Sequence, residues 1–367
     1  MNTQNVNNLE ISAQAEDTAM QDNRQLPLSE AREIVKDLFT PNPRIYWLDF
    51  LVHITIGWSA FYLTLKSPPF SLWQLLFYII SALALYRALI FTHELAHLRR
   101  NTFRLFRFIW NVTCGFPFMV PSYMYNGVHN DHHKKNIYGT KDDGEYLPFA
   151  ADKPYKIVLY LLLAFVLPLL AVGRFILLTP LSWLHRGLRH FLWESASSLT
   201  IDMSYHRPEP SSRDEETWQL QEFFTFLYGA TAMGLAIAGV LPWQALLLWY
   251  LVAVLIFLLN SLRTLAAHAY RNQGNTIMDI TGQYLDSVNI PGNNLVTPLW
   301  APVGLRYHAT HHLFPALPYH ALGEAHRRLA GNLSEKALYL QTTRNSLWDA
   351  LHRLWHEAHS RHQVEGL

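Results

Sequence analysis

Long apolar runs alternate with polar, histidine-rich segments along this 367-residue chain. A helix needs about 20 consecutive apolar residues to cross a bilayer. Polar or proline-containing breaks, Lys66-Ser67-Pro68-Pro69 and Pro242-Trp243, join four such runs into two pairs. We therefore predict two transmembrane hairpins, with spans at about 45–65, 72–92, 223–241 and 244–262.

The remaining segments have weaker patterns. Residues 1–28 are polar and lack an apolar signal sequence, so we expect a disordered tail, followed by a single membrane domain at 29–367. The stretch at 29–39 is amphipathic, 105–120 is apolar but interrupted, and 320–360 has a helical pattern. The predicted fold is all-α and membrane-embedded, with interfacial helices and a cytosolic helical cap.

Composition supports a membrane protein. Half of the residues are hydrophobic and 16% are charged, below the roughly 25% that is typical of soluble domains. The net charge of +1 and the lack of a basic, aromatic-rich run give no sign of nucleic-acid binding. The single cysteine, Cys114, excludes an internal disulfide and any multi-cysteine metal site.

Histidines are concentrated in three short boxes at the edges of apolar runs. The boxes are H-E-L-A-H at 93–97, H-N-D-H-H at 129–133 and H-A-T-H-H at 308–312. On a helix, residues three or four apart share a face, so each box directs its imidazoles to one side. Imidazole is the commonest metal ligand. The boxes therefore predict a metal site built from His93, His97, His129, His132, His133, His308, His311 and His312, with His268 as a possible ninth ligand.

The positions of the boxes constrain the topology. Residues 98–156 carry nine Lys and Arg residues, whereas the turn at 66–71 carries only Lys66, so the first two boxes are predicted on the cytoplasmic side. A fifth apolar run, 157–178, contains Pro168. If this run crossed the membrane once, the third box would emerge on the opposite side. We therefore predict that it lies in the interface or enters and returns, which places both termini in the cytoplasm.

Two other functions fit parts of the pattern. The first box also matches H-E-x-x-H, in which Glu94 would be the general base of a zinc protease. One four-coordinate zinc cannot use so many histidines. A metal transporter is the second alternative, but transport sites generally lie near the middle of the bilayer. Eight or nine imidazoles fit two metal ions with open positions, and iron with such ligands can activate O2.

The three boxes, in this order and flanked by paired apolar runs, resemble the integral-membrane fatty acid desaturase and hydroxylase superfamily. The resemblance covers about residues 45–330. It implies a diiron centre, four transmembrane helices with a cytosolic cap, and electrons from a separate redox protein. In the similar animal acyl-CoA desaturases, a ninth histidine lies between the second and third boxes, and His268 corresponds to it. Those enzymes have an asparagine one turn earlier that holds a metal-bound water, whereas this chain has Thr264, with Asn260 one turn further back.

Several polar residues could support the ligands or the substrate. Carboxylates that accept hydrogen bonds from imidazole fix its orientation; the candidates are Glu94 and Asp131 inside the boxes, and Asp142, Asp143, Asp279 and Asp286 outside them. Arg306 and Tyr307 precede the third box and are candidates for binding a carboxyl or phosphate group of the substrate.

The resemblance leaves the reaction open among three outcomes of C–H abstraction. We rank a fatty acid desaturase first, a decarboxylase that forms 1-alkenes second, and an alkyl or acyl hydroxylase third. All three would use two Fe ions, O2, a fatty acid or acyl-lipid substrate, and a separate ferredoxin- or rubredoxin-like donor with its reductase. The compact loops resemble bacterial members, so we expect an inner-membrane protein surrounded by lipid, with a cytoplasmic active site.

Overall fold

The computed structural model describes residues 25–99, 101–274 and 276–365, and these form an all-helical protein with a few isolated β-bridges. The elements are α2 (Leu28–Val35), η1 (Lys36–Leu38), α3 (Pro43–Lys66), α4 (Leu72–His97), α5 (Arg104–Trp110), η2 (Asn111–Gly115), α6 (Tyr123–His132), α7 (Tyr155–Val172), η3 (Gly173–Leu178), α8 (Thr179–Ser182), α9 (Arg186–Ala196), α10 (Ser212–Ile237), α11 (Trp243–Leu265), α12 (Ile280–Leu285), α13 (Thr297–Trp300), α14 (His308–Leu313), α15 (Tyr319–Asn332), α16 (Lys336–Leu340) and α17 (Leu347–Glu365).

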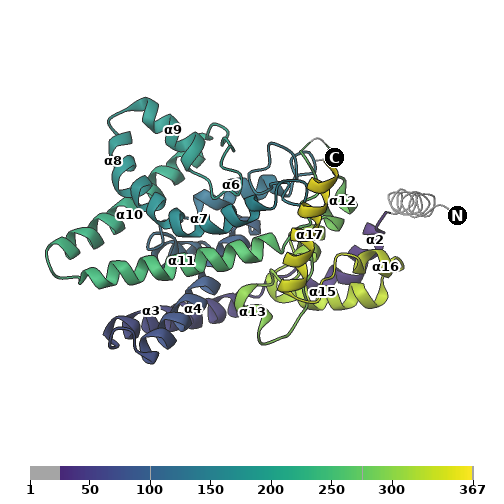
Figure 1. Ribbon diagram of the computed structural model, residues 1–367, viewed down its shortest axis with the longest axis horizontal. Coiled ribbons are helices and arrows are strands. Elements are labelled where there is room, and N and C mark those ends of the chain that lie inside the picture. The colour runs from purple at the N-terminus through teal and green to yellow at the C-terminus, as the bar shows by residue number, and fades with distance from the viewer. Residues whose placement is uncertain (1–24, 100, 275, 366–367) are drawn as a thin grey trace.

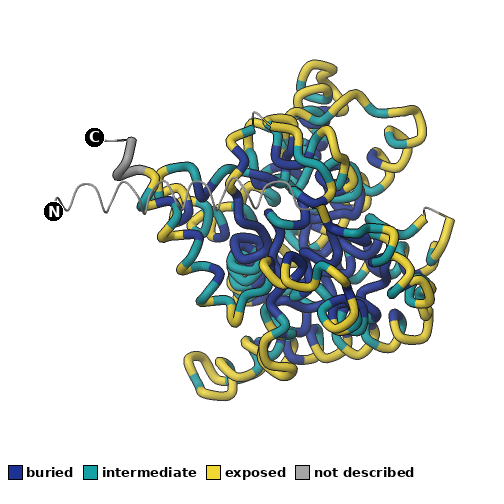
Figure 2. Tube along the Cα trace, turned by 90° about the vertical axis from the view of Figure 1, so that its right-hand side faces the viewer, coloured by how far each residue is buried: buried dark blue, intermediate teal, exposed yellow. Residues whose placement is uncertain are grey.

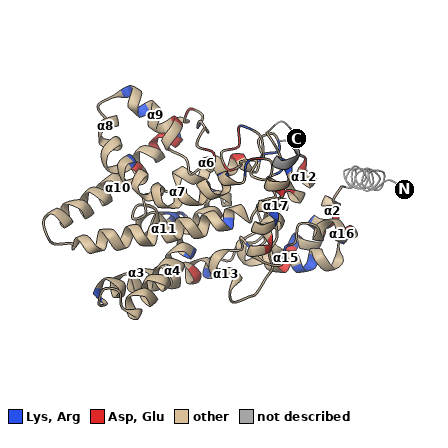
Figure 3. Ribbon diagram, in the orientation of Figure 1, with Lys and Arg blue, Asp and Glu red and all other residues tan. Residues whose placement is uncertain are grey.

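The helices divide the molecule into two ends along its long axis. The hairpins α3–α4 and α10–α11 extend to one end, while α2, α12 and α15 to α17 gather at the other (Figure 1). Lys, Arg, Asp and Glu are sparse along the long helices and more frequent in the helical cap and the loops beside it (Figure 3). This separation of apolar and charged ends is what an integral membrane protein with a polar cap requires.

The hairpin of α3 and α4 packs closely. Asn42 and Ser71 cap the two helices through their side chains, and Pro68 and Pro69 form the turn between them. A Cβ added at Gly57 would lie 2.6 Å from Cγ of Leu85, so only glycine allows this approach. The close packing fixes the direction of α4, which carries the first histidine box in its last two turns.

The set of helices long and apolar enough to span a membrane differs in one member from the predicted set. Among the described residues, four helical segments qualify, at Pro43–Lys66, Leu72–His97, Tyr155–Ser182 and Trp243–Leu265. Residues 223–241, which we predicted as a span, belong to α10 and its C-terminal turn, and α10 is not among the four. The reason is composition: α10 carries Gln219, Gln221 and Glu222 next to its apolar part, whereas the third segment has no charged residue between Lys156 and Arg174.

The segment that contains 157–178 is one continuous helical stretch. Pro168 lies inside α7 without ending it, and the helix continues through the π-helical turn η3 into α8. The chain then returns through α9, and the backbone amide of Ile201 donates to the carbonyl of Gly144 over 2.8 Å. At the start of this segment, Ile157 belongs to a buried cluster with Tyr138 and Tyr146. Both ends of this excursion therefore lie near the stretch that follows the second histidine box.

A buried ion-pair network holds this excursion against α10. The Glu222 carboxylate, which is fully buried, accepts a 2.6 Å hydrogen bond from Arg174 and a further bond from Arg189. Arg174 also donates to the carbonyl of Ala196. One carboxylate thus joins η3, α9 and α10.

The structure describes residues 25–28 of the segment that we predicted as a polar tail. Residues 1–24 of the predicted tail lie outside the described residues. Leu26 is buried in a cluster with residues of α15 and α16, and Gln25 donates to the Asp279 carboxylate. The helical prediction for 320–360 is confirmed by α15, α16 and α17. The dark-blue interior in Figure 2 shows how completely these elements enclose the centre of the molecule.

Candidate metal centre

Four separate parts of the chain deliver histidines to the centre of the molecule. His93 and His97 lie one turn apart at the end of α4; His129, His132 and His133 lie at the end of α6; and α14 contributes the third box. His268 follows the end of α11, where an isolated bridge pairs it with Ser287. The nine histidines singled out from the sequence therefore all converge.

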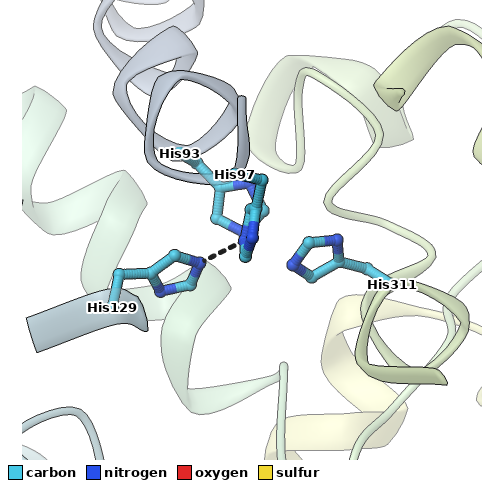
Figure 4. Close-up of side chains that lie close together, drawn as sticks. All are labelled: His93, His97, His129 and His311. Atoms are coloured by element: carbon cyan, nitrogen blue, oxygen red, sulfur yellow. Dashed lines mark hydrogen bonds between the residues drawn. The ribbon is translucent and has the colours of Figure 1, made fainter. Parts of the chain in front are cut away.

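Eight of these histidines form two groups of four. One group contains His93, His97, His129 and His311, and the other contains His132, His268, His308 and His312. Within each group, one nitrogen of every ring lies within 4.8 Å of the others. Figure 4 shows the first group, with rings from α4, α6 and α14 pointing toward one another. His133 contacts both groups: its Nε2 lies 3.3 Å from that of His129 and 3.2 Å from that of His311, and its ring centroid lies 4.3 Å from that of His312.

The spacing of the nitrogens is suitable for metal ions. The Nε2 atoms of His97 and His129 are 2.8 Å apart, and those of His268 and His308 are 2.9 Å apart. Two nitrogens that bind one ion at about 2.1 Å and at right angles lie roughly 3 Å apart. Both ring nitrogens of His93 are buried without a hydrogen-bond partner, which is costly unless a metal is bound. The donor set therefore fits two ions held by neutral nitrogen ligands.

Burial keeps most of these imidazoles neutral, as metal binding requires. For His129, His133, His268 and His308, burial is the main cause that holds the pKa well below its usual value, and neighbouring histidines add to it. Burial also lowers the pKa of His132, but the Asp143 carboxylate outweighs it and the net pKa is raised.

Carboxylates and a tyrosine contact the Nδ1 atoms of several of these rings. His132 Nδ1 lies 2.8 Å from the Asp143 carboxylate, and His129 Nδ1 lies 2.9 Å from Glu145. The pKa of Glu145 is raised to about 8, mainly by burial. The Tyr138 hydroxyl lies 2.9 Å from His268 Nδ1 and donates to Asp286. These partners orient the rings, which raises their ability to bind metal.

Two of these partners were missed in the sequence, and two predicted ones have other contacts. Glu145 and Tyr138 were not among the candidates, although both lie in the polar segment after the second box. Asp131 instead pairs with Lys134 over 2.6 Å. Glu94 has one oxygen 3.9 Å from His93 Nδ1, but its other oxygen accepts bonds from the Tyr46 hydroxyl and the Tyr319 amide.

The other candidate residues fall into two classes. Asp143 and Asp286 contact the site directly or through Tyr138, as described above, whereas Asp279 caps α12 and the exposed Asp142 contacts Thr140. Asn260 and Thr264 line a cavity next to the histidines. Arg306 and Tyr307 do not line that cavity: Arg306 contacts Asn294 and Pro291, and Tyr307 packs on His326.

The cavity next to the histidines has a volume of about 410 Å³. His93, His129, His268 and His308 line one part of it. The residues of α7 and η3 that line the cavity are mostly apolar, among them Leu163, Leu167, Leu170 and Phe175. A larger cavity of about 980 Å³ lies on the other face of α4 and α6 and contains none of the nine histidines. The smaller cavity is therefore the one that can bring an apolar chain to the metal ligands.

Comparisons with known proteins agree with this geometry. A family model described as fatty acid desaturase matches residues 69–344. A ceramide hydroxylase from Caulobacter vibrioides (strain NA1000 / CB15N) is 41% identical over 323 residues, which cover 88% of this chain and 91% of the relative. With its paired histidine groups, apolar helices and these matches, the chain belongs to the fatty acid desaturase family, whose members are membrane oxidoreductases.

Proposed function

We propose that this protein is an O2-dependent, non-haem diiron hydroxylase that acts on the hydrocarbon part of a ceramide-like lipid. The observation that carries the proposal is the pair of histidine groups that open into a cavity lined by apolar helix faces. The extensive similarity to a ceramide hydroxylase favours hydroxylation, third in the ranking from sequence, over desaturation and decarboxylation.

The nine histidines are the proposed iron ligands, with His133 placed to contact either ion. Bound iron would supply the reduction of O2 and the removal of hydrogen from an unactivated C–H bond. The balanced reaction is R–H + O2 + 2 e⁻ + 2 H⁺ → R–OH + H2O, so a separate redox protein, of ferredoxin or rubredoxin type, must supply electrons. We also propose that the centre faces the cytoplasm of a bacterial inner membrane, where such donors are found.

The protein's own residues determine where the substrate lies. The apolar side chains of α7 and α11 would exclude water from the hydrocarbon chain of the substrate. Asp143, Glu145 and Tyr138 hold the imidazole rings in a fixed orientation. The protease alternative has little support from the geometry, because one Glu94 oxygen already accepts hydrogen bonds from Tyr46 and Tyr319.

The test is turnover by the purified, iron-loaded protein. A chain-defined ceramide would be incubated with ¹⁸O2 and a reduced ferredoxin system, and the lipids analysed by mass spectrometry. A product that carries one ¹⁸O atom is expected. Loss of two hydrogens without oxygen incorporation would identify a desaturase, and 1-alkene release from a free fatty acid would identify a decarboxylase. Either result would overturn hydroxylation while keeping the diiron centre.

A further inference from the structure

The larger cavity, of about 980 Å³, lies beside the helices that carry the first two histidine boxes but contains none of the proposed metal ligands. One face of α10 forms its longest wall. The lining residues of this helix recur every three or four positions, at Arg213, Thr217, Leu220, Phe224, Leu227 and Thr231. The helix runs toward the turn that joins it to α11 (Figure 1). The cavity therefore follows α10 from its first turn along most of its length.

Arginines line the cavity at the first turn of α10. Arg213 is exposed on the helix itself. The guanidinium of Arg207 lies against α6, where a Cβ added at Gly127 would be 2.8 Å from Nη2 of Arg207. Burial lowers the pKa of Arg207, and the charge of Asp214, the next residue after Arg213, is among the causes that raise it. The two guanidiniums therefore belong to the same end of the cavity.

This end of the cavity has an excess of positive charge. Arg107 is a third arginine in the lining, and Asp214 is the one carboxylate among the described lining residues. Arg207 donates to the carbonyl of Ser197 over 2.7 Å, and no carboxylate among the described residues forms an ion pair with Arg207 or Arg213. Arginine binds phosphate groups through paired hydrogen bonds. The charge therefore fits an anionic group, and a phosphate in particular.

Farther along α10 the lining is apolar. Phe108 and Val112, from α5 and η2, and Phe224, Leu227 and Leu235, from α10, line the cavity and are 40–60% exposed. Phe224 and Leu235 are separated by about 17 Å along the helix axis, at 1.5 Å per residue. The hydrocarbon layer of one bilayer leaflet is about 15 Å thick. The apolar part of the cavity therefore has the length of a lipid acyl chain.

The two ends together select one class of lipid. A hydrocarbon chain alone would leave the arginines without an anionic partner, and the proposed ceramide substrate carries no charge. A zwitterionic phospholipid brings a cation together with its phosphate. A phospholipid with an uncharged headgroup carries a net negative charge, and basic pockets between membrane helices bind such headgroups.

We propose that this cavity binds an anionic glycerophospholipid of the surrounding membrane, with its phosphate at Arg207 and Arg213 and one acyl chain along the C-terminal half of α10. The site is separate from the cavity proposed for the substrate. Leu95 and Ala96 of α4 and Asn130 of α6 also line it, and they alternate with the histidines of the first two boxes. The bound lipid therefore packs against both helices that carry these boxes.

The first test compares two lipids that differ only in the headgroup. The full-length protein, stripped of lipid in detergent, would be titrated with 1-palmitoyl-2-oleoyl phosphatidylglycerol or with the matching phosphatidylcholine, and bound lipid counted by native mass spectrometry. We expect one phosphatidylglycerol to bind about tenfold more tightly or better, as for hydrogen bonds to a charged group. The double variant Arg207→Gln/Arg213→Gln should lose this preference. Arg186→Gln, at an exposed site on α9 outside the cavity, is the matched control.

Equal affinity for the two lipids, or a wild-type preference in the double variant, would overturn the proposal. If the double variant fails to fold, Arg213→Gln alone, at an exposed site, should weaken phosphatidylglycerol binding about fivefold, the effect of one basic residue near an anionic lipid. Unchanged binding by this single variant would then overturn the proposal.

The second test concerns the acyl chain. Phe224→Ala should weaken phosphatidylglycerol binding severalfold, because apolar contact area is lost. Phe223→Ala is the matched control, since Phe223 is 44% exposed against 42% for Phe224 but does not line the cavity. Equal effects of the two variants would overturn the placement of the chain. Competition by glycerol 3-phosphate as strong as by the lipid would assign the site to a free phosphate ester instead. These measurements need neither iron nor turnover, so their failure leaves the proposed hydroxylase function intact.

Discussion

At the scale of single residues, the carboxylates that bond to the histidine rings determine how those rings are oriented. Asp143 accepts from His132 and is itself held by the backbone amides of Gly139 and Glu145. The adjacent Asp142 is exposed and makes no contact with a histidine. Two neighbouring carboxylates of the same type therefore have different roles.

Asp143→Asn should reduce iron affinity by about 10- to 100-fold, because an amide orients and polarises the His132 ring less effectively than a carboxylate. The measurement is iron retained per protein during titration with a chelator. Asp142→Asn is the matched control and should retain iron like wild type. Equal retention by both variants would contradict the role of Asp143.

His326, which is not a proposed ligand, makes stability depend on pH. Burial, with a contribution from Arg306, lowers its pKa to about 4, and its Nδ1 lies 3.0 Å from the Tyr339 hydroxyl. The unfolded chain, with a pKa near 6.5, binds the proton first. This contribution to stability is therefore present above about pH 6.5 and is lost as the pH falls toward 4.

We expect the unfolding midpoint of wild type to fall between pH 6.5 and 4.5 more steeply than that of His326→Gln. The measurement is thermal unfolding across this pH range in one detergent. His352→Gln, on α17, keeps His326 and should follow the wild-type curve. Identical slopes for wild type and His326→Gln would show that His326 does not carry this dependence.

The residues that sequence could identify are those whose position follows from helical spacing. His93 and His97 share a face because they are four apart, and the same holds for His129 and His133. Glu145 was missed because its contact with His129 depends on the turn that begins at Thr140, and a helical pattern carries no information about that turn. Arg306 was a reasonable candidate from its proximity to the third box, but the backbone before α14 directs it to Asn294.

At the scale of elements, buried charge explains why α7 to α10 are arranged as they are. Glu222 neutralises Arg174 from η3 and Arg189 from α9, so three elements depend on one carboxylate. Hydropathy predicted the long helices well, because apolar length is sufficient for that purpose. The segment at 157–178 was set aside as a span because of the side on which the third box must emerge, and not because of its hydropathy, which is the highest among the four qualifying helices.

Glu222→Gln should destabilise the protein by about 3–5 kcal/mol, because the buried guanidinium of Arg174 and the partly buried guanidinium of Arg189 would lose their carboxylate partner. The measurement is the free energy of unfolding in a mixed-micelle denaturant titration. Glu215→Gln, at an exposed site on the same helix, should have little effect. A Glu222→Gln variant as stable as wild type would show that the network does not hold these elements together.

At the scale of the whole molecule, the histidines connect elements that lie far apart in the sequence. α4, α6, the end of α11 and α14 meet at the two groups of four. A metal that binds the folded state and not the unfolded chain stabilises the whole fold.

Removal of iron should therefore lower the unfolding temperature, and Co²⁺ should restore it, because neutral imidazoles bind either metal. The measurement is thermal unfolding of native, chelated and reconstituted protein in the same detergent. His311→Ala should lose most of this metal-dependent stabilisation, whereas His352→Ala should retain it. A thermal midpoint that does not respond to metal would contradict a shared centre.

The histidines of each group come from distant parts of the sequence, which determines when each group becomes complete during synthesis. His93 leaves the ribosome long before His312, and neither group of four is complete until α14 has been translated. The apolar helices all precede α14 in the sequence. If the two groups bind the proposed metals, metal delivery would therefore be a late step that follows synthesis of these helices.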